Sequence, residues 1–167
     1  SHHYDISDGL YDLFLDPKKQ YSCAYFENEN DSLETAQNKK IQHIIKKLNI
    51  QPNQKILDIG CGWGSLAIDI AKSVKCEVTG ITLSENQFKF CNEKVKKMNL
   101  ENQVKFRLVD YRELKEKFDR IVSVGMFEHV GRKFYKKFFK QIERLLKDDG
   151  ISLIHTIGSV NPPRDPH

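Results

Sequence analysis

The chain has 167 residues, of which 39% are hydrophobic and 30% charged, and its formal net charge is +4. This size fits one domain, and the composition excludes the disordered and membrane-spanning classes, because no apolar run approaches the roughly 20 residues of a spanning helix. So mild a positive charge permits attraction to anionic surfaces without choosing between nucleic acid and phospholipid.

The first part of the chain, residues 1–32, is rich in turn-forming and aromatic residues. We expect short helices and loops there, forming a segment that covers a cofactor or substrate. From Leu33 to Asn49 the apolar residues recur with helical spacing, which predicts a helix. That helix opens the main domain, which we place at residues 33–167.

Strands and helices alternate through the rest of the chain. The expected strands are KILDIG (55–60), CEVTGITL (76–83), VKFRLVD (104–110), FDRIVSVGM (118–126) and ISLIHTI (151–157). The expected helices are 65–74, 84–99 with Ser84 as N-cap, and 132–147, the last closed by Asp-Asp-Gly at 148–150. The alternation predicts an α/β fold with a mostly parallel sheet and helices on both faces.

Ligands of such sheets bind outside the carboxyl ends of the strands, so the residues just after each strand carry the functional signal. These are GCGWG (60–64), TLSENQ (82–87), DYRE (110–113), GMFEHVG (125–131) and HTIG (155–158). The four cysteines form neither a C-x-x-C pair nor a zinc-finger spacing with histidine, so we predict no metal site. We interpret them as reduced thiols of a cytoplasmic protein.

The glycine turn between the first strand and its helix points to a cofactor. Gly60, Gly62 and Gly64 let a ligand approach the backbone, and the helix behind them offers free N–H groups. A dinucleotide site would need G-x-G-x-x-G and an acid after the second strand, and both are missing. The alternative is a tight turn needed only for packing.

The sequence resembles S-adenosylmethionine-dependent methyltransferases, and among them the cyclopropane-fatty-acyl-phospholipid synthases and their mycolic acid relatives. The matching segments are HYD (3–5), YSCAYF (21–26), LETAQNKK (33–40), LDIGCGWG (57–64), VTGITLSENQ (78–87), DYR (110–112), SVGMFEHVG (123–131) and LIHTIG (153–158). The resemblance implies a Rossmann-like class I methyltransferase sheet with about five of its strands present. The last hairpin and an anion-binding tyrosine would lie beyond residue 167, so we expect a fragment.

The resemblance also assigns the cofactor residues. Tyr21 and Ser22 would contact the methionine end, with Gly60 and Gly62 beneath it. The ribose would be held by Thr82 and Gln87, and the adenine flanked by Tyr111 and Arg112. For Tyr21 the alternative is a core aromatic, although aromatic faces do suit a sulfonium cation.

The family reaction forms a cyclopropane ring by moving a methylene equivalent onto the cis double bond of an acyl chain. The resemblance implies a bound bicarbonate as base, held by Glu128, His155, the backbone of Ile157 and the region of Cys23. Alternatively, Glu128 caps the following helix and His155 is a satisfied core histidine. Neighbours on a strand point to opposite faces, so we take His129 as structural. A nucleophilic role for Cys23 is not expected, because no base stands beside it.

The predicted substrate is an unsaturated phospholipid acyl chain. The helix at 132–147 is basic and amphipathic, so it is either a membrane contact at a bacterial inner membrane or, as we favour, an ordinary covering helix with a solvated face. No motif for nucleic acid occurs. An exposed last strand would invite a homodimer. The competing functions are a small-molecule N- or O-methyltransferase and an inactive cofactor-binding fragment.

Overall fold

A computed structural model describes residues 15–158 of the chain. The HYD motif at 3–5 and the proline-rich tail at 161–167 lie outside the described residues. In residues 15–32 the backbone forms turns and bends without a helix, so the short helices expected there are not found in that part. No helix among the described residues combines the length and the apolar character needed to span a membrane.

The core of the fold is a five-stranded sheet with the strand order β3-β2-β1-β4-β5, in which every pairing is parallel. Its strands are β1 (Lys55–Ile59), β2 (Glu77–Thr82), β3 (Val104–Leu108), β4 (Phe118–Val124) and β5 (Leu146–His155). The chain leaves β1 towards β2 and β3 and returns to the other side of β1 with β4. This reversal creates a switch point between β1 and β4, where open parallel sheets bind ligands.

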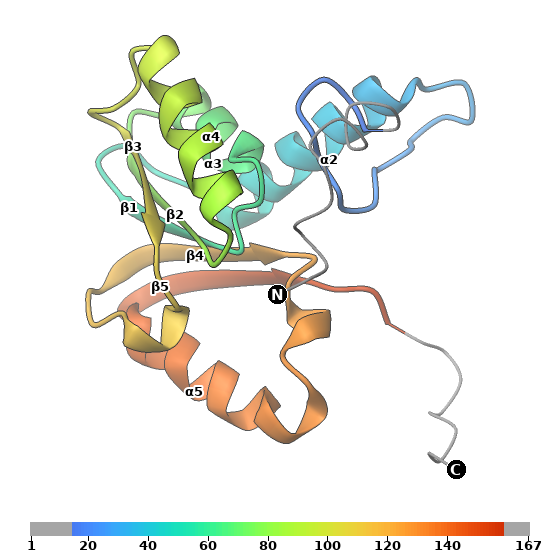
Figure 1. The fold of residues 1–167 in the computed structure, drawn as a ribbon. Helices are drawn as coiled ribbons and strands as arrows, with labels where there is room; N and C mark the ends of the chain where they lie inside the picture. The colour runs from blue at the N-terminus through green and yellow to red at the C-terminus, as the bar shows by residue number, and fades with distance from the viewer. Residues whose placement is uncertain (1–14, 159–167) are drawn as a thin grey trace.

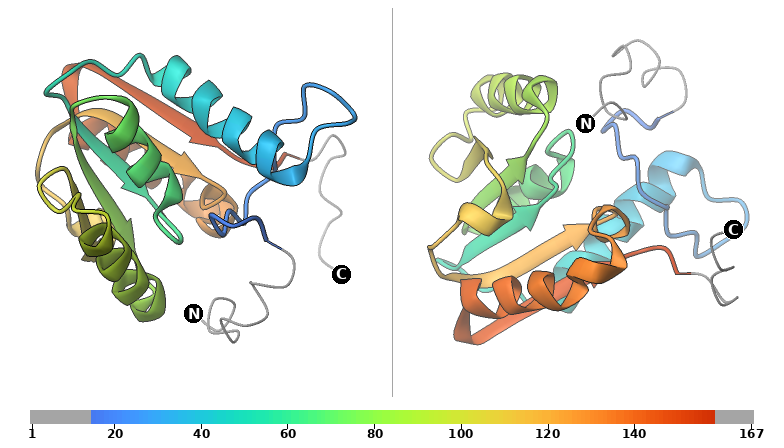
Figure 2. Two further views of the ribbon diagram at one scale, coloured as in Figure 1. Left: turned by 90° about the horizontal axis from the view of Figure 1, so that it is seen from above. Right: turned by 60° about the horizontal axis from the view of Figure 1, so that its bottom comes forward.

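Helices cover both faces of the sheet, as the α/β prediction required (Figure 1). The helices are α2 (Leu33–Leu48), α3 (Ser65–Ser73), α4 (Glu85–Lys97) and α5 (Tyr135–Leu145). Figure 2 shows α5 on the side of the sheet opposite to α2, α3 and α4. Short 3-10 helices follow β3 and β4, at Tyr111–Glu113, Phe127–His129 and Arg132–Phe134.

Alternating side chains give the sheet two cores. Ile56 of β1 joins the core under α2, α3 and α4, whereas its neighbour Leu57 packs on the α5 side with Phe138. Both faces of each central strand are therefore apolar, which is typical of a parallel sheet buried between helix layers. The predicted N-cap of α4 is confirmed, because the Ser84 hydroxyl accepts a hydrogen bond from Gln87 N at 3.3 Å.

The region after residue 131 differs from the prediction. The expected helix at 132–147 begins with a 3-10 turn, becomes α-helical at Tyr135 and ends at Leu145. Strand β5 begins at once, because Leu146 pairs with Phe118 at the start of β4. The next matched pair is Arg120 with Ile151, so the residues expected as a helix stop form an irregularity within the strand.

Candidate active site

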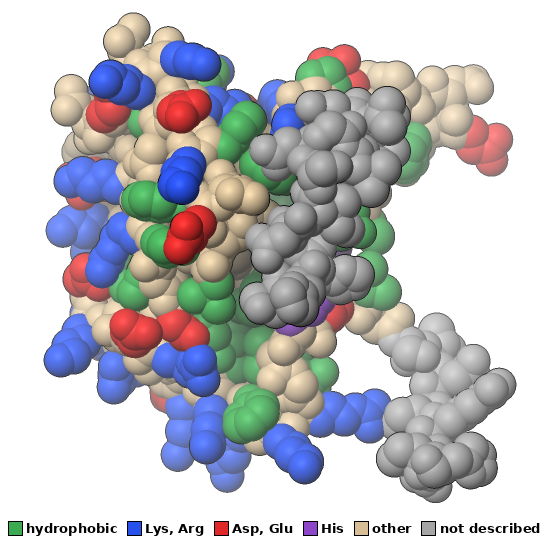
Figure 3. Space-filling view, viewed as in Figure 1, with side chains coloured by type: hydrophobic (Ala, Val, Ile, Leu, Met, Phe, Trp, Pro, Cys, Tyr) green, Lys and Arg blue, Asp and Glu red, His purple; other side chains and the backbone are tan. Residues whose placement is uncertain are grey.

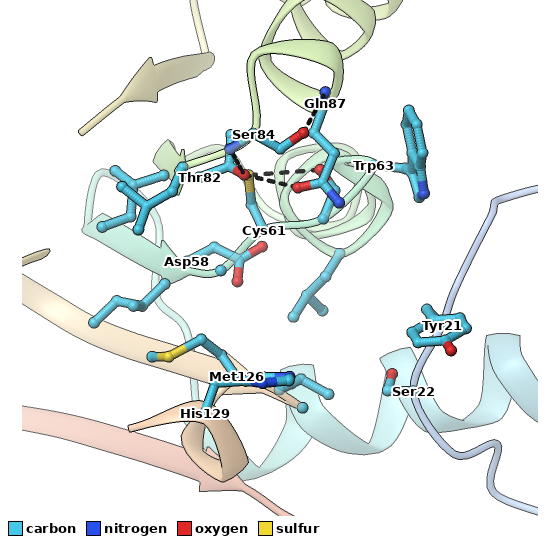
Figure 4. Close-up of a pocket in the computed structure, with 18 of the residues that line it drawn as sticks. Tyr21, Ser22, Asp58, Cys61, Trp63, Thr82, Ser84, Gln87, Met126 and His129 are labelled. Atoms are coloured by element: carbon cyan, nitrogen blue, oxygen red, sulfur yellow. Dashed lines mark hydrogen bonds between the residues drawn. The ribbon is translucent and has the colours of Figure 1, made fainter. Parts of the chain in front are cut away.

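A cavity of about 1170 Å³ lies at the carboxyl ends of β1 to β4. The segments that follow these four strands line it, together with residues of α2 and of the covering segment 19–22. Figure 4 shows side chains from β1, β2, the segments that follow β1, β2 and β4, and the covering segment around one space. Its size is somewhat above the usual range for small-molecule sites, about 300 to 1,000 Å³.

The glycine turn forms the floor of the cavity, as the sequence predicted. All three glycines have positive φ, namely +76° at Gly60, +53° at Gly62 and +77° at Gly64. A Cβ at Gly60 would stand 2.9 Å from Met126, and one at Gly64 would stand 2.6 Å from Phe106. A Cβ at Gly62 would meet nothing within 4 Å. Packing therefore requires two of the glycines, and the third leaves its backbone open to the cavity.

Asp58, which the sequence analysis missed, lies below this turn. Its side chain is 2% exposed and lines the cavity, and Oδ2 finds no hydrogen-bond partner among the described residues. Burial raises the pKa of this carboxyl group from 3.8 to about 7. The signal in the sequence was an acid inside the apolar run KILDIG. Buried carboxylates normally have partners, so the unpaired oxygen indicates a group that enters from the cavity.

Polar side chains at the end of β2 form a closed set of hydrogen bonds (Figure 4). The Thr82 hydroxyl donates to Gln87 Oε1 at 2.7 Å and accepts from Ser84 N at 3.1 Å. Both Thr82 and Gln87 are buried, with 6% and 8% of their surfaces exposed. The structure thus brings together the two residues predicted for the ribose, and the amide nitrogen of Gln87 remains available for a ligand.

The segment after β3 brings Tyr111 and Arg112 to the cavity wall, as the sequence predicted. Tyr111 packs edge-on against Phe138 with 5.3 Å between ring centroids. The Arg112 guanidinium binds both carboxylate oxygens of Asp110 at 2.9 and 2.5 Å. This hydrogen bond lowers the pKa of the Asp110 carboxyl group, although burial opposes the shift. The pair leaves an ionised carboxylate beside the Tyr111 ring.

The covering segment reaches the cavity through Tyr21 and Ser22. Tyr21 is 62% exposed, so the alternative of a core aromatic is wrong. Helix α2 holds the segment through two buried polar residues that sequence reasoning also missed. Gln37 Nε2 donates to the carbonyl of Ser22 at 3.0 Å, and Lys40 Nζ donates to its hydroxyl at 2.7 Å. Both residues stand in LETAQNKK (33–40), three positions apart on one helix face, which was the available signal.

The end of β4 corrects the interpretation of His129. Strand pairing stops at Val124, and Phe127–His129 forms a 3-10 helix. Neighbouring residues therefore do not alternate between two faces as they would on a strand. His129 lines the cavity beside Met126 (Figure 4), whereas Glu128 does not line it.

Glu128 instead faces the segment after β5. Its Oε1 accepts a hydrogen bond from Ile157 N at 2.6 Å. Burial raises the pKa of the Glu128 carboxyl group, but the bonds from Ile157 N and the Thr156 side chain outweigh it and the net pKa is lowered. The N-cap residue of α5 is Phe134, and no side chain caps it, so the alternative of Glu128 as a helix cap is wrong.

The structure brings His155 and Cys23 only partly to the places expected for them beside Glu128. His155 ends β5 opposite Val124, and its buried Nδ1 has no hydrogen-bond partner among residues 15–158, so the alternative of a satisfied core histidine is wrong. Cys23 follows Ser22 and is exposed, and neither Cys23 nor His155 lines the cavity. The structure therefore joins Glu128 to Ile157 beside His155 but shows no contact of Cys23 with them.

Comparisons with known proteins agree with this arrangement. The family model of mycolic acid cyclopropane synthetase matches residues 1–165. A cyclopropane-fatty-acyl-phospholipid synthase of Escherichia coli strain K12 is 48% identical over 94% of this chain. A solved mycolic acid cyclopropane synthase, CmaA1, complexed with SAH and CTAB, has a TM-score of 0.88 at 40% identity over 92% of this chain. A coclaurine N-methyltransferase, bound to N-methylheliamine and SAH, has a TM-score of 0.86 at 28% identity over 93%.

The relatives are longer than this chain. It spans 40% of the length of the Escherichia coli synthase and 54% of that of the solved CmaA1.

Proposed function

Because the chain belongs to the mycolic acid cyclopropane synthetase family, we propose that it takes part in S-adenosylmethionine-dependent cyclopropane formation on an unsaturated phospholipid acyl chain. The observation that carries the proposal is the buried Asp58 carboxylate, whose Oδ2 has no hydrogen-bond partner among the described residues, beneath an open glycine turn. Such a site suits a ligand that presents a cationic nitrogen next to the backbone. The amino-acid end of S-adenosylmethionine has that chemistry.

The other lining residues fit the rest of this cofactor. The Thr82–Gln87 pair offers fixed hydrogen-bonding groups to ribose hydroxyls, and Tyr111 and Arg112 offer flat faces to an adenine ring. Tyr21 would lie against the sulfonium centre, because an aromatic face attracts a cation. When bound, S-adenosylmethionine supplies a methyl group on a positively charged sulfur, which a double bond can attack.

The residues after β4 would hold the acyl chain. Met126, Val130 and Phe134 line this side of the cavity and offer apolar surface to a hydrocarbon. Attack by the double bond leaves positive charge on the chain, and water would trap it as an alcohol. An apolar wall excludes that water, and a nearby negative group stabilises the charge. Glu128, with its lowered pKa, is ionised at neutral pH, and although it does not itself line the cavity, it is the group we assign to this role.

One part of the proposal does not fit the described geometry, namely bicarbonate as the base that removes the last proton. The Ile157 N–H, which the family resemblance assigns to bicarbonate, donates to Glu128 at 2.6 Å. An ionised Glu128 would also repel a second anion at this place. Bicarbonate therefore stays a prediction, and turnover in carbon dioxide-depleted buffer, with and without added bicarbonate, tests it.

A surface beside the cavity supports peripheral contact with an anionic membrane. Phe134 and Lys137 line the cavity, and Phe134 remains 52% exposed. Figure 3 shows Lys and Arg side chains gathered over this part of the molecule. The exposed basic residues of segment 132–147 are Arg132, Lys133, Lys136, Lys137, Lys140, Arg144 and Lys147. Cosedimentation with phosphatidylglycerol vesicles against neutral vesicles tests the contact, and binding equal for both would contradict it.

Two further expectations belong to the same proposal. The covering role of residues 1–32 is supported by Tyr21 and Ser22 at the cavity, and the assignment of 33–167 to the methyltransferase domain by the sheet that this range contains. A homodimer through β5 is supported by the position of this strand at one edge of the described sheet. Sedimentation velocity tests it, and a monomer at micromolar concentration would contradict it.

The deciding experiment uses S-adenosylmethionine with a labelled methyl group. Vesicles of cis-unsaturated phospholipid should take up label into lipid, and saturated vesicles should not. The likeness to coclaurine N-methyltransferase justifies a second arm with secondary amines as acceptors. Label in the amine alone would favour the small-molecule function, and cofactor binding without transfer would favour an inactive fragment.

A further inference from the structure

Lys40 is a buried cation at the cavity that the proposed reaction has not used. It lies on the face of α2 that carries Gln37 one turn earlier, and only 7% of its surface is exposed. Its Nζ donates to Ser22 Oγ at 2.7 Å, and the residue lines the cavity. Within residues 15–158, no carboxylate oxygen lies within the 4.0 Å of an ion pair with it.

The carboxylate that acts on Lys40 does not neutralise it. Asp16 contributes an attractive charge, but its oxygens accept hydrogen bonds from Lys18 N, Gln20 N and Gln20 Nε2. Burial lowers the pKa of the Lys40 ammonium from 10.5 to about 8, and Asp16 and Cys23 oppose the shift only partly. Lys40 is therefore still charged at neutral pH. A buried ammonium without an anion is costly, so a partner supplied by a ligand would complete the site.

The cavity thus holds two buried groups of opposite charge whose partners are incomplete. One is the Asp58 carboxylate, at the glycine turn, whose Oδ2 has no hydrogen-bond partner among the described residues, and the other is the ammonium of Lys40, at the covering segment. No ion pair joins them to each other among the described residues. An α-amino acid carries an ammonium and a carboxylate on one carbon atom, so it offers a partner of the matching charge to each of the two groups.

We infer that Lys40 binds the carboxylate of the amino-acid end of the cofactor, with Ser22 as its neighbouring hydrogen-bond donor. This inference rests on the proposed function, since it takes S-adenosylmethionine as the occupant of the cavity. It gives different roles to the two residues of α2 that hold the covering segment. Gln37 fixes the backbone of Ser22, whereas Lys40 adds the charge that the ligand recognises.

The test compares two ligands that differ in one group. S-adenosylmethionine and decarboxylated S-adenosylmethionine share the adenosine, the sulfonium and the amine, and only the first has a carboxylate. Isothermal calorimetry at pH 7 should show that the full chain prefers the first ligand by about 10- to 100-fold. Lys40→Met should remove most of this preference and leave the affinity for the decarboxylated ligand within about twofold. Lys40→Arg should restore much of it, because a guanidinium also binds a carboxylate.

Lys47→Met is the matched control, because Lys47 is exposed on the same helix. It should change neither affinity. Equal losses for both ligands in Lys40→Met would overturn the inference and leave Lys40 a structural residue. A wild-type chain that binds both ligands equally would also overturn it without any variant, and would leave the proposed function standing. A wild-type chain that binds neither ligand would contradict the proposed function, and the inference would fall with it.

Discussion

At the end of β2 the polar groups are already joined to one another, whereas at the ends of β4 and β5 they come from distant segments and are only partly connected. Thr82, Ser84 and Gln87 lie within six residues of sequence and form a closed set of hydrogen bonds. Glu128 and Ile157 are 29 residues apart, and a single bond of 2.6 Å joins their segments. The cofactor therefore meets a preformed surface at the end of β2. The chemistry at the ends of β4 and β5 depends on tertiary contacts.

The largest effect, on turnover, should come from a substitution at the ends of β4 and β5. Glu128→Gln keeps an oxygen that can accept from Ile157 N but removes the negative charge, so turnover should fall about 100- to 10,000-fold. The affinity for S-adenosylhomocysteine should stay within about twofold, because Glu128 does not line the cavity. Labelled transfer and calorimetry on the same preparation measure both.

Glu143→Gln provides the control for that substitution, since Glu143 is exposed on α5. Turnover of Glu128→Gln equal to that of this control would contradict the assignment. A parallel loss of cofactor affinity would show that the two sides of the site are not independent.

The next effect, on stability, concerns Asp58 near the end of β1. Its pKa is raised from 3.8 to about 7, so the folded state loses stability as pH rises from about 4 through 7. Asp58→Asn lacks this loss, and above pH 7 the ligand-free variant should be more stable than wild type by at most about 4 kcal/mol. Urea unfolding at pH 4.5 and pH 8 measures the difference.

The same variant should bind S-adenosylhomocysteine more weakly than wild type, because the amide cannot neutralise an ammonium. Stability traded against binding is the pattern expected of a carboxylate kept for a ligand. A stability difference that stays constant between the two pH values would contradict the raised pKa of Asp58.

A smaller effect is expected at Gly62. Alanine at φ +53° costs about 1 to 2 kcal/mol in stability, and its methyl group would stand in the cavity, so cofactor affinity should fall about 10-fold. Gly131→Ala is the matched control, because Gly131 has φ +75°, meets only Phe134 at 3.9 Å and does not line the cavity. Equal affinity in both variants would show that the cofactor does not approach the glycine turn.

The smallest effect should come from Thr82→Val, which removes the donor to Gln87 Oε1. The buried amide oxygen loses its partner, so the free energy of unfolding should fall by about 1 to 3 kcal/mol. Cofactor affinity should fall only a few-fold, since Gln87 keeps its place on α4. Thr79→Val, on the same strand, controls for the change of side-chain shape. Unchanged stability would mean that the preformed network contributes nothing.

The same contrast decides how much could be predicted from the sequence. Thr82, Gln87 and Tyr111 reach the cavity as expected, because each stands in a short segment at or just after the end of a strand. Tyr21 also reaches it, but its place was expected from the family resemblance alone and depends on contacts of its segment with α2. The expectation for His129 failed because the strand ends at Val124 and a 3-10 turn replaces its alternation. No periodicity in the sequence marks that change.

The burial of two charged side chains could also not be predicted from the sequence. Asp58 reads as one polar residue in an apolar strand, and Lys40 as one of several lysines on an amphipathic helix. Only tertiary packing shows that both are buried and that neither has an ionic partner within the described residues. The boundary between α5 and β5 was also missed, since it is set by the pairing of Leu146 with Phe118 rather than by local sequence.

That boundary has a dynamic consequence. Helix α5 ends at Leu145 and β5 begins at Leu146, so no loop separates them and neither can open without pulling on the other. Their backbone amides should exchange hydrogen with solvent at similar rates, as one cooperative unit. Strand β5 leads directly to Ile157, whose N–H donates to Glu128. Such an opening would therefore break the hydrogen bond between Ile157 and Glu128. Motions of α5 would then limit the rate of turnover without changing the hydrogen bonds at the end of β2.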